Sequence, residues 1–260
     1  MKKSACSDTE KNRAKYIKIA AAVLFWLVVW QAAAAAVNKK ILLVSPTAVA
    51  VRLFHLVAEP TFWQTVGFSL LRIAVGFLLA VLLGIVLAAL SASFEPLRIL
   101  LLPIVTAIKT VPVASFIILV LIWFPSERLS SVISFLMVLP VIYTNTQSGI
   151  MSMKKELGEM AEVFRVPLFR RIRCVYIPQI MPDFKAGCEI SLGLCWKSGI
   201  AAEVIGMPDG SIGEALQQAK VYLNTPDLFA WTVVIVIVSA LFAKLFILLL
   251  SRLEKAVTRV

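Results

Sequence analysis

The sequence predicts an all-α protein that crosses a membrane about six times. Of its 260 residues, 60% are hydrophobic, only 16% are charged, and the mean hydropathy is +0.90. A soluble chain of this length would need more polar surface. The apolar residues also gather in runs of roughly 20, the length of helix that crosses the hydrocarbon core of a bilayer. The fold class is therefore a polytopic helical membrane protein.

The first apolar run covers residues 17–37 and follows a basic leader. A basic start, an apolar core and a run of alanines are also found in cleaved signal peptides. The leader is long, however, and no cysteine-rich secreted segment follows, so a retained first helix is the favoured interpretation. Residues 46–62 come next and predict an amphipathic helix near the outer interface.

The second and third apolar regions differ in their small and rigid residues. Residues 66–90 carry three glycines, which permit close approach of helices in lipid. Residues 97–124 are interrupted by Pro103 and Pro112. Proline is tolerated in a membrane helix where neighbours satisfy the freed carbonyls, and such kinks commonly line a cavity. We therefore expect the third region to line a path.

Three further spans complete the predicted set. Residues 129–150 contain Pro140 in their middle, residues 183–205 are the least apolar, and residues 228–250 are the most uniformly apolar. With six spans both termini lie on one side. Placing them inside gives 17 basic residues in inner segments against 5 in outer segments, out of 26. Because Lys and Arg accumulate in cytoplasmic loops, this predicts cytoplasmic N- and C-termini.

The charge and the cysteines exclude some functions. The net charge is +11, but no basic stretch is interleaved with aromatic residues on a soluble module, so no nucleic-acid partner is expected. Cys6, Cys174, Cys188 and Cys195 form no C-x-x-C pair, and His55 stands alone, so no metal site is expected.

A charged segment lies between the fourth and fifth spans. Leu157, Met160, Ala161 and Phe164 are spaced as one apolar face of a helix, with glutamates on the other side. Pro167 then suits the start of a second helix. We expect this second helix to end at the prolines before the fifth span. Such a pair of amphipathic helices can rest on anionic lipid or dock a cytoplasmic partner.

This segment resembles the EAA loop of permease subunits of ABC importers. Glu159, Ala161, Val175, Ile177 and Pro178 match in register, whereas Met160 replaces an alanine and Arg165 replaces the family's glycine. Glycine permits a sharp turn, so Arg165 puts the turn in doubt. Residues 69–77, 118–125 and 196–229 resemble the nitrate, sulfonate, taurine and bicarbonate branch, and the likeness covers roughly residues 45–255.

The resemblance implies a type I ABC importer permease fold. Residues 1–44 would form the N-terminus and first helix, and residues 45–255 the transmembrane domain, with a coupling loop at 154–178. The partners implied are two cytoplasmic ATPase subunits, an extracytoplasmic binding protein that delivers substrate, and a second permease copy, with membrane lipid around them. The residues implied to contact the ATPase are Glu159 and Ala161, with Met160, Phe164 and Arg165 beside them.

The residues themselves predict that the chain is not an enzyme and binds no cofactor. No glycine is followed by lysine, so the G-x-x-x-x-G-K-[ST] phosphate loop is absent. ATP must then be bound by partner subunits. A single histidine also leaves no base for a hydrolytic triad.

Charged residues inside spans are functional candidates because burying them in lipid is costly. Lys109, Pro112, Glu189 and Lys197 are the candidates for the translocation path, and the two lysines would suit a small anionic solute. The alternatives are an ion pair between helices and a lysine that reaches the interface. Glu189 and Lys197 share roughly one helix face, and Glu203 is offset from them.

Two other functions stay open at this point. One is a secondary transporter driven by an ion gradient, which would need acidic residues in several spans. The other is a non-transporting membrane component. Neither the transported substrate nor a choice between homodimer and heterodimer follows from the sequence, although a chain without internal repeats favours a homodimer. Residues 206–227 predict a turn at Pro208, Asp209 and Gly210 followed by a short helix.

Overall fold

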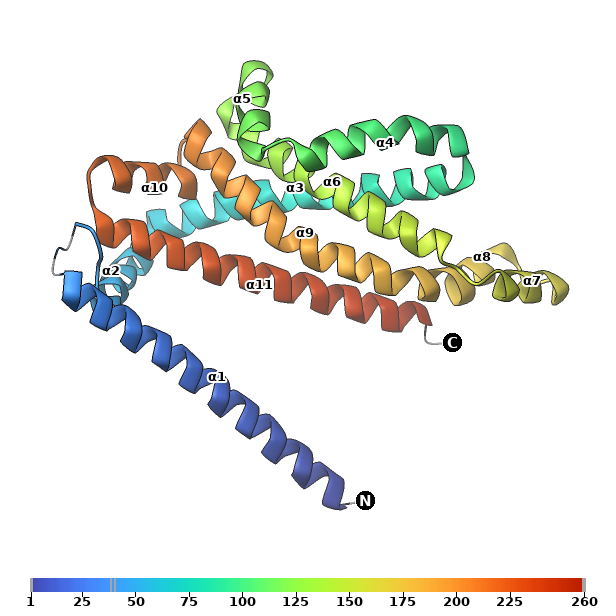
Figure 1. Ribbon diagram of the computed structural model, residues 1–260, viewed down its shortest axis with the longest axis horizontal. Coiled ribbons are helices and arrows are strands. Elements are labelled where there is room, and N and C mark those ends of the chain that lie inside the picture. Colours follow the sequence, from blue (N-terminus) through green and yellow to red (C-terminus); the bar gives the residue numbers. More distant parts are fainter. Residues whose placement is uncertain (1, 38, 40, 259–260) are drawn as a thin grey trace.

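The computed structural model describes residues 2–37, 39 and 41–258, and within these ranges the chain folds into helices joined by short turns (Figure 1). The side chains of residues 2–16, 155 and 257–258 are not described, so Cys6 and the basic residues predicted for the leader lie outside the described part, as does Lys40. The elements are α1 (Lys2–Val37), α2 (Pro46–Ala58), α3 (Pro60–Ser93), α4 (Glu95–Thr110), α5 (Val113–Trp123), α6 (Ser126–Met151), α7 (Lys155–Val163), α8 (Leu168–Arg171), a π-helix (Ile172–Tyr176), α9 (Ile177–Gly206), α10 (Ile212–Val221) and α11 (Thr225–Thr258).

Four helices are long and apolar enough to cross a membrane, and a bent pair makes five. The four are α1 from residue 17, α3, α6 and α11, and the pair is α4 with α5. α9 has 30 residues, about 45 Å at 1.5 Å per residue, but it is too polar to pass the same test. Five of the predicted spans are thus found on length and apolarity, and the sixth, over residues 183–205, lies within α9 and stays a prediction.

α4 and α5, the proline-broken region between α3 and α6, carry the chain back across the bundle. The Ser131 hydroxyl donates to the Arg72 carbonyl oxygen at 2.8 Å, and Gln147 Nε2 donates to Ser91 Oγ at 2.9 Å. Residue numbers rise together in these two contacts, so α3 and α6 run in parallel. α4 and α5 must therefore bring the chain back, and they do so with a bend of 108° at Pro112. The predicted break is confirmed, while Pro103 lies inside α4.

α9 lies against α6 in the opposite direction. The Ser134 hydroxyl donates to the Cys195 carbonyl oxygen at 3.1 Å, and the Lys154 amide donates to Gln179 Oε1 at 3.0 Å. α3, α6, α9 and α11 enclose the main apolar core. Within it the rings of Phe77 and Phe246 pack edge to face, with their centroids 4.9 Å apart.

The two ends of the bundle carry different elements (Figure 1). We call the end with α7, α8 and the C-terminal end of α11 the loop end, and the end with α2 and α10 the opposite end. α1 joins the bundle only near its C-terminal end, where Trp30 and Phe229 lie with ring centroids 5.7 Å apart. Its N-terminal end points back toward the side of the loop end.

The amphipathic helix predicted over residues 46–62 is α2, and it ends earlier than expected. Glu59 is extended because the residue before a proline disfavours the helical conformation, and Pro60 then starts α3. An ion pair between Arg52 and Asp227 ties α2 to the start of α11. The hydrogen bonds that Arg52 donates to the Asp227 carboxylate raise the pKa of Arg52, so the guanidinium stays charged.

Candidate functional site

The charged segment at the loop end forms two helices, as predicted, but the second does not stop at the prolines. α7 covers Lys155–Val163 and α8 begins directly after Pro167. From there the chain continues through the π-helix into α9, with Pro178 in the first turn of α9 and Pro182 inside it. Pro178 has no amide hydrogen to donate to the turn before it, yet the helix continues through it. The expected end of the second helix is therefore wrong, and the loop is continuous with a span.

Arg165 occupies the turn after α7 in a left-handed conformation, with φ of 48°. Its amide donates to the Glu162 carbonyl oxygen at 2.9 Å, and the Val166 amide donates to the Ala161 carbonyl oxygen at 2.9 Å. These two bonds define a Schellman motif, which usually has glycine at the left-handed position. The sharp turn that the family glycine permits is thus present here with arginine in its place.

An ion pair holds α7 and α8 together. Arg171 Nη1 lies 3.0 Å from Glu162 Oε1, and the guanidinium stands over the Tyr176 ring, 5.3 Å from its centroid. The hydrogen bond to Glu162 raises the pKa of Arg171, so the cation persists. Residues from α7, α8 and the π-helix thus brace one compact corner.

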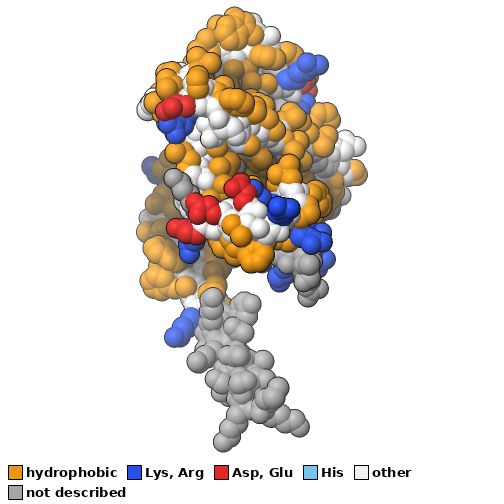
Figure 2. All heavy atoms as spheres, turned by 90° about the vertical axis from the view of Figure 1, so that its right-hand side faces the viewer, with side chains coloured by type: hydrophobic (Ala, Val, Ile, Leu, Met, Phe, Trp, Pro, Cys, Tyr) orange, Lys and Arg blue, Asp and Glu red, His pale blue; other side chains and the backbone are white. Residues whose placement is uncertain are grey.

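The apolar face of this corner is turned outward. Phe164 and Phe169 are 74% and 78% exposed, and Val163 and Leu168 are exposed beside them. We call these four residues the loop tip. Figure 2 views the loop end and shows acidic, basic and apolar side chains close together on it. Four large apolar side chains at the end of a charged loop have no partner within the described chain.

The predicted coupling residues do not all share this exposure. Glu159, Met160 and Arg165 are exposed, as is Phe164. Ala161 is only 2% exposed, so its side chain packs inward. Its direct contact with a partner, which the resemblance implies, stays a prediction.

The four candidates for the translocation path lie on the surface of this chain, on α4 and α9 and at the α4–α5 bend. Lys109 donates from Nζ to Thr144 Oγ1 of α6 at 3.0 Å, and Pro112 is exposed at the bend. Glu189 and Lys197 are exposed on one stripe of α9. Among the described residues no salt bridge joins any of these charges. The structure therefore leaves a polar stripe uncovered and brings no ion pair together.

A buried polar cluster was missed by the sequence interpretation, which noted Glu203 without giving it a role. Its side chain is 0% exposed, and Oε2 accepts a hydrogen bond from the Ser69 hydroxyl at 2.7 Å. Ser69 and Glu203 are 134 residues apart, and only the packing of α3 on α9 joins them. In the sequence, the one sign of this cluster was a glutamate inside a span, on a different helix face from Glu189 and Lys197.

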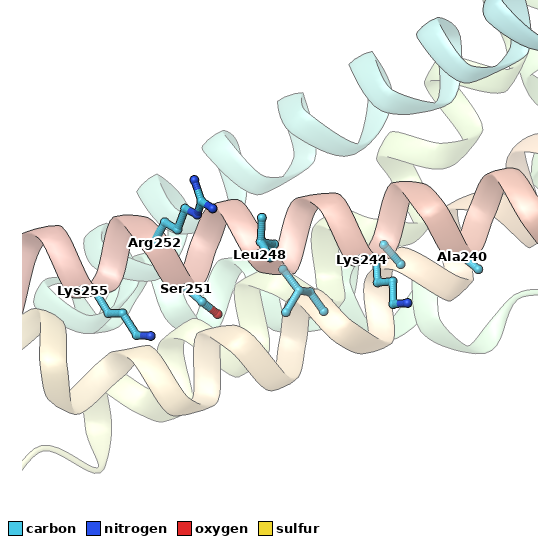
Figure 3. A pocket seen from close by; sticks show the side chains of 8 residues that line it. Ala240, Lys244, Leu248, Ser251, Arg252 and Lys255 are labelled. Atoms are coloured by element: carbon cyan, nitrogen blue, oxygen red, sulfur yellow. The ribbon is translucent and has the colours of Figure 1, made fainter. Parts of the chain in front are cut away.

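A hollow in the described surface runs along one face of α11 (Figure 3). It holds about 590 Å³, and all eight lining residues belong to α11. Lys244, Arg252 and Lys255 project from this face. A hollow lined by one helix is an open groove and lacks the converging polar groups of a ligand site.

The chain matches known transport proteins in sequence. Residues 80–259 match the family described as binding-protein-dependent transport system inner membrane component. An aliphatic sulfonates transport permease of Bacillus subtilis strain 168 is 27% identical over 80% of this chain and 75% of its own. The taurine transport system permease of Escherichia coli K12 is 27% identical over 70% of this chain and 66% of its own. Other relatives are named as bicarbonate and nitrate permeases.

A solved structure shares the fold. A chain from the crystal structure of an amino acid ABC transporter with histidines aligns with a TM-score of 0.50 at 18% identity. The alignment covers 74% of this chain and 90% of that one. At this identity the likeness concerns the arrangement of the helices.

Proposed function

The chain belongs to the family of inner-membrane components of binding-protein-dependent transport systems, and from this premise we propose that its α7–α8 loop couples the permease to a cytoplasmic ATPase. As a member of this family it is a permease subunit of an ABC importer, of the branch whose relatives are named for sulfonates, taurine, nitrate and bicarbonate. The chain is not an enzyme. Family membership favours this role over a gradient-driven transporter or a non-transporting component.

The exposed loop tip is the observation that carries the proposal. Phe164 and Phe169 are each about three-quarters exposed, although they stand on a corner braced by the Arg171–Glu162 pair. Aromatic side chains on a rigid corner suit the centre of a protein interface. Phe164, Met160, Glu159 and Arg165 would enter a groove on the ATPase, and Ala161 would pack beneath them.

The assembly follows from the same premise. We propose two ATPase subunits, which bind the ATP, beneath two permease copies, with a binding protein at the opposite end and lipid around the spans. The homodimer is the simplest pairing for a chain of this kind. Cytoplasmic termini are supported by the excess of basic residues in inner segments. They are also supported by the place of the α11 C-terminal end at the loop end, where Arg173 of the π-helix donates to the Ala256 carbonyl oxygen at 3.1 Å.

A small anionic solute is the proposed cargo. The relatives named for sulfonates, taurine and nitrate support this class. In this chain Lys109 and Lys197 lie uncovered on α4 and α9, and neither forms a salt bridge among the described residues. We assign Lys109, Pro112, Glu189 and Lys197 to the path.

Stimulated ATP hydrolysis in reconstituted membranes tests the coupling proposal. The permease would be combined with its ATPase and binding protein, and wild type compared with Glu159→Ala plus Phe164→Ala. Wild type should hydrolyse ATP faster when substrate-loaded binding protein is added, and the double variant should lose at least nine-tenths of that stimulation. Full stimulation in an intact, co-purified double variant would refute the role of the loop.

A matched pair of substitutions controls for changes at the same end of the molecule. Phe94→Ala plus Glu95→Ala removes an exposed aromatic ring and an exposed carboxylate from the α3–α4 turn at the loop end. This control should keep the stimulation within twofold of wild type. If no ATPase associates with wild-type permease at all, the gradient-driven alternative regains its place.

A further inference from the structure

The buried carboxylate of Glu203 binds the N-terminus of α10. Its Oε2 accepts hydrogen bonds from the Ser69 hydroxyl at 2.7 Å and from the Gly213 amide at 3.3 Å. The Ser69 oxygen in turn accepts a bond from the Ile212 amide at 2.9 Å. One side chain from α3 and one from α9 thus meet the first two amides of α10.

This arrangement leaves the start of α10 fully bonded. The first amides of a helix have no partner within the helix and must find one elsewhere. Ser69 takes the amide of Ile212, Glu203 takes that of Gly213, and the N-cap Ser211 takes that of Glu214 at 3.0 Å. A carboxyl oxygen that accepts hydrogen bonds also complements the positive end of the helix dipole. α10 is therefore held by the spans beneath it.

The contact between α10 and α9 is made backbone to backbone. A Cβ placed on Gly213 would lie 2.2 Å from the Cβ of Glu203 and 2.4 Å from its carbonyl carbon. Real atoms do not approach so closely, so only glycine allows this crossing. The turn between the two helices is equally confined, with Pro208 fully buried in it. α10 cannot shift toward α9 and has little freedom to turn.

α9 connects this cluster, at the opposite end, to the loop end of the molecule. Its 30 residues run from the π-helix at the α7–α8 loop to the turn before α10. A displacement of the loop would therefore reach α10 through one continuous helix. π-helical turns inside α-helices are often found at functional sites.

We propose that Glu203 is a positioning residue for transport, which locks α10 to α3 and α9 so that α10 moves with them when the loop is displaced. The part that concerns transport rests on the proposed function, whereas the lock is a property of the chain itself. α10 is then a fixed part of the transport unit and does not open as a separate lid.

A distance measurement tests the lock without transport. Spin labels at Gln64→Cys on α3 and Lys220→Cys on α10, both exposed positions, report the separation of the two helices in the assembled complex. Cys6 and Cys174 would be replaced by serine in this background. A narrow distribution is expected with Glu203, one at least twofold broader with Glu203→Ala, and no change with Glu127→Gln, an exposed carboxylate of α6.

Substrate uptake into liposomes then tests the consequence. Glu203→Ala should lower uptake at least tenfold while the ATPase still co-purifies, and Glu203→Gln should fall in between. Unchanged distances in both variants would overturn the lock. Broadened distances with wild-type uptake would overturn the role in transport.

The design also separates failure of the proposed function from failure of a variant to fold. If wild type takes up no substrate, the proposed function fails, and the distances still decide whether Glu203 holds α10. If Glu203→Ala does not fold, Glu203→Gln and Ser69→Ala provide the same comparison, since each weakens one bond of the cluster.

Discussion

The corners at the two ends of α9 both contain a left-handed residue, but they differ in how far their side chains are covered. At the loop end, α7 turns through the left-handed residue Arg165 and leaves the loop tip exposed. At the opposite end, α9 turns through the left-handed residue Met207, and α10 is sealed onto the bundle by Glu203. At the opposite end, side chains of the chain itself hydrogen-bond the start of α10. At the loop end, apolar side chains stay exposed, and we propose that a partner covers them.

The comparison predicts that substitutions at the sealed corner cost folding stability, whereas those at the open corner cost association. The largest effect is expected from Gly213→Val. The new side chain would overlap the backbone of α9, so we expect a loss of about 3 kcal/mol. The thermal unfolding midpoint of the detergent-solubilised permease measures it. Gly67→Ala, where a Cβ would meet nothing within 4 Å, should leave the midpoint unchanged or slightly raised.

A smaller loss is expected from Ser69→Ala. Removing the hydroxyl leaves the buried amide of Ile212 without its partner, which costs about 1–3 kcal/mol. The same unfolding midpoint would show it. Ser93→Ala removes an exposed hydroxyl bonded only to its own helix, at the Ala89 carbonyl oxygen, and should change little. Equal effects of the two serines would contradict the sealed corner.

A gain is expected when Arg165 is replaced by glycine. A left-handed conformation costs a residue with a Cβ about 1 kcal/mol, so Arg165→Gly should raise the unfolding free energy by that amount. Leu223, which has φ of 55° at the end of α10, offers an independent check, since Leu223→Gly should give a similar gain. A lower midpoint for both variants would show that these turns carry no strain.

The smallest effect on stability is expected from Phe169→Ala. The ring is 78% exposed, so the substitution should change the free energy of unfolding by no more than about 0.5 kcal/mol, as measured from the unfolding midpoint. ATPase association, measured by titration of the ATPase onto permease in nanodiscs, should nevertheless weaken at least tenfold. A stable variant with undiminished association would remove Phe169 from the proposed interface.

The sequence predicted the open corner better than the sealed one. Helix spacing around Met160 and Phe164 and the resemblance of residues 154–178 identified the loop before its geometry was known. The spans also followed from apolarity, because lipid forces each of them to be helical. The continuation of α8 into α9 was not predicted, since a proline near a helix start can either end or begin a helix.

The burial and hydrogen bonds of Glu203 at the sealed corner could not be predicted from the sequence, for a physical reason. Glu203 differs from Glu189 only in the direction it faces, and its partner Ser69 is 134 residues away. Burial and pairing of a charge depend on how α3 packs on α9, and no local pattern reports that. Gly213 was likewise not predicted, because its need for glycine arises from the close crossing of α10 on α9, which the sequence does not reveal.

The bend between α4 and α5 has a consequence for what surrounds the permease. Where a helix stops, its last carbonyl groups lose their partners within the helix. α4 stops at Thr110, in the middle of a segment that crosses the bundle, and a 108° bend follows. Hydrocarbon cannot hydrogen-bond such groups, so this part of the surface must face protein or water. The bend therefore marks a part of the surface that lipid tails do not cover, where either a second protein surface or water should be sought.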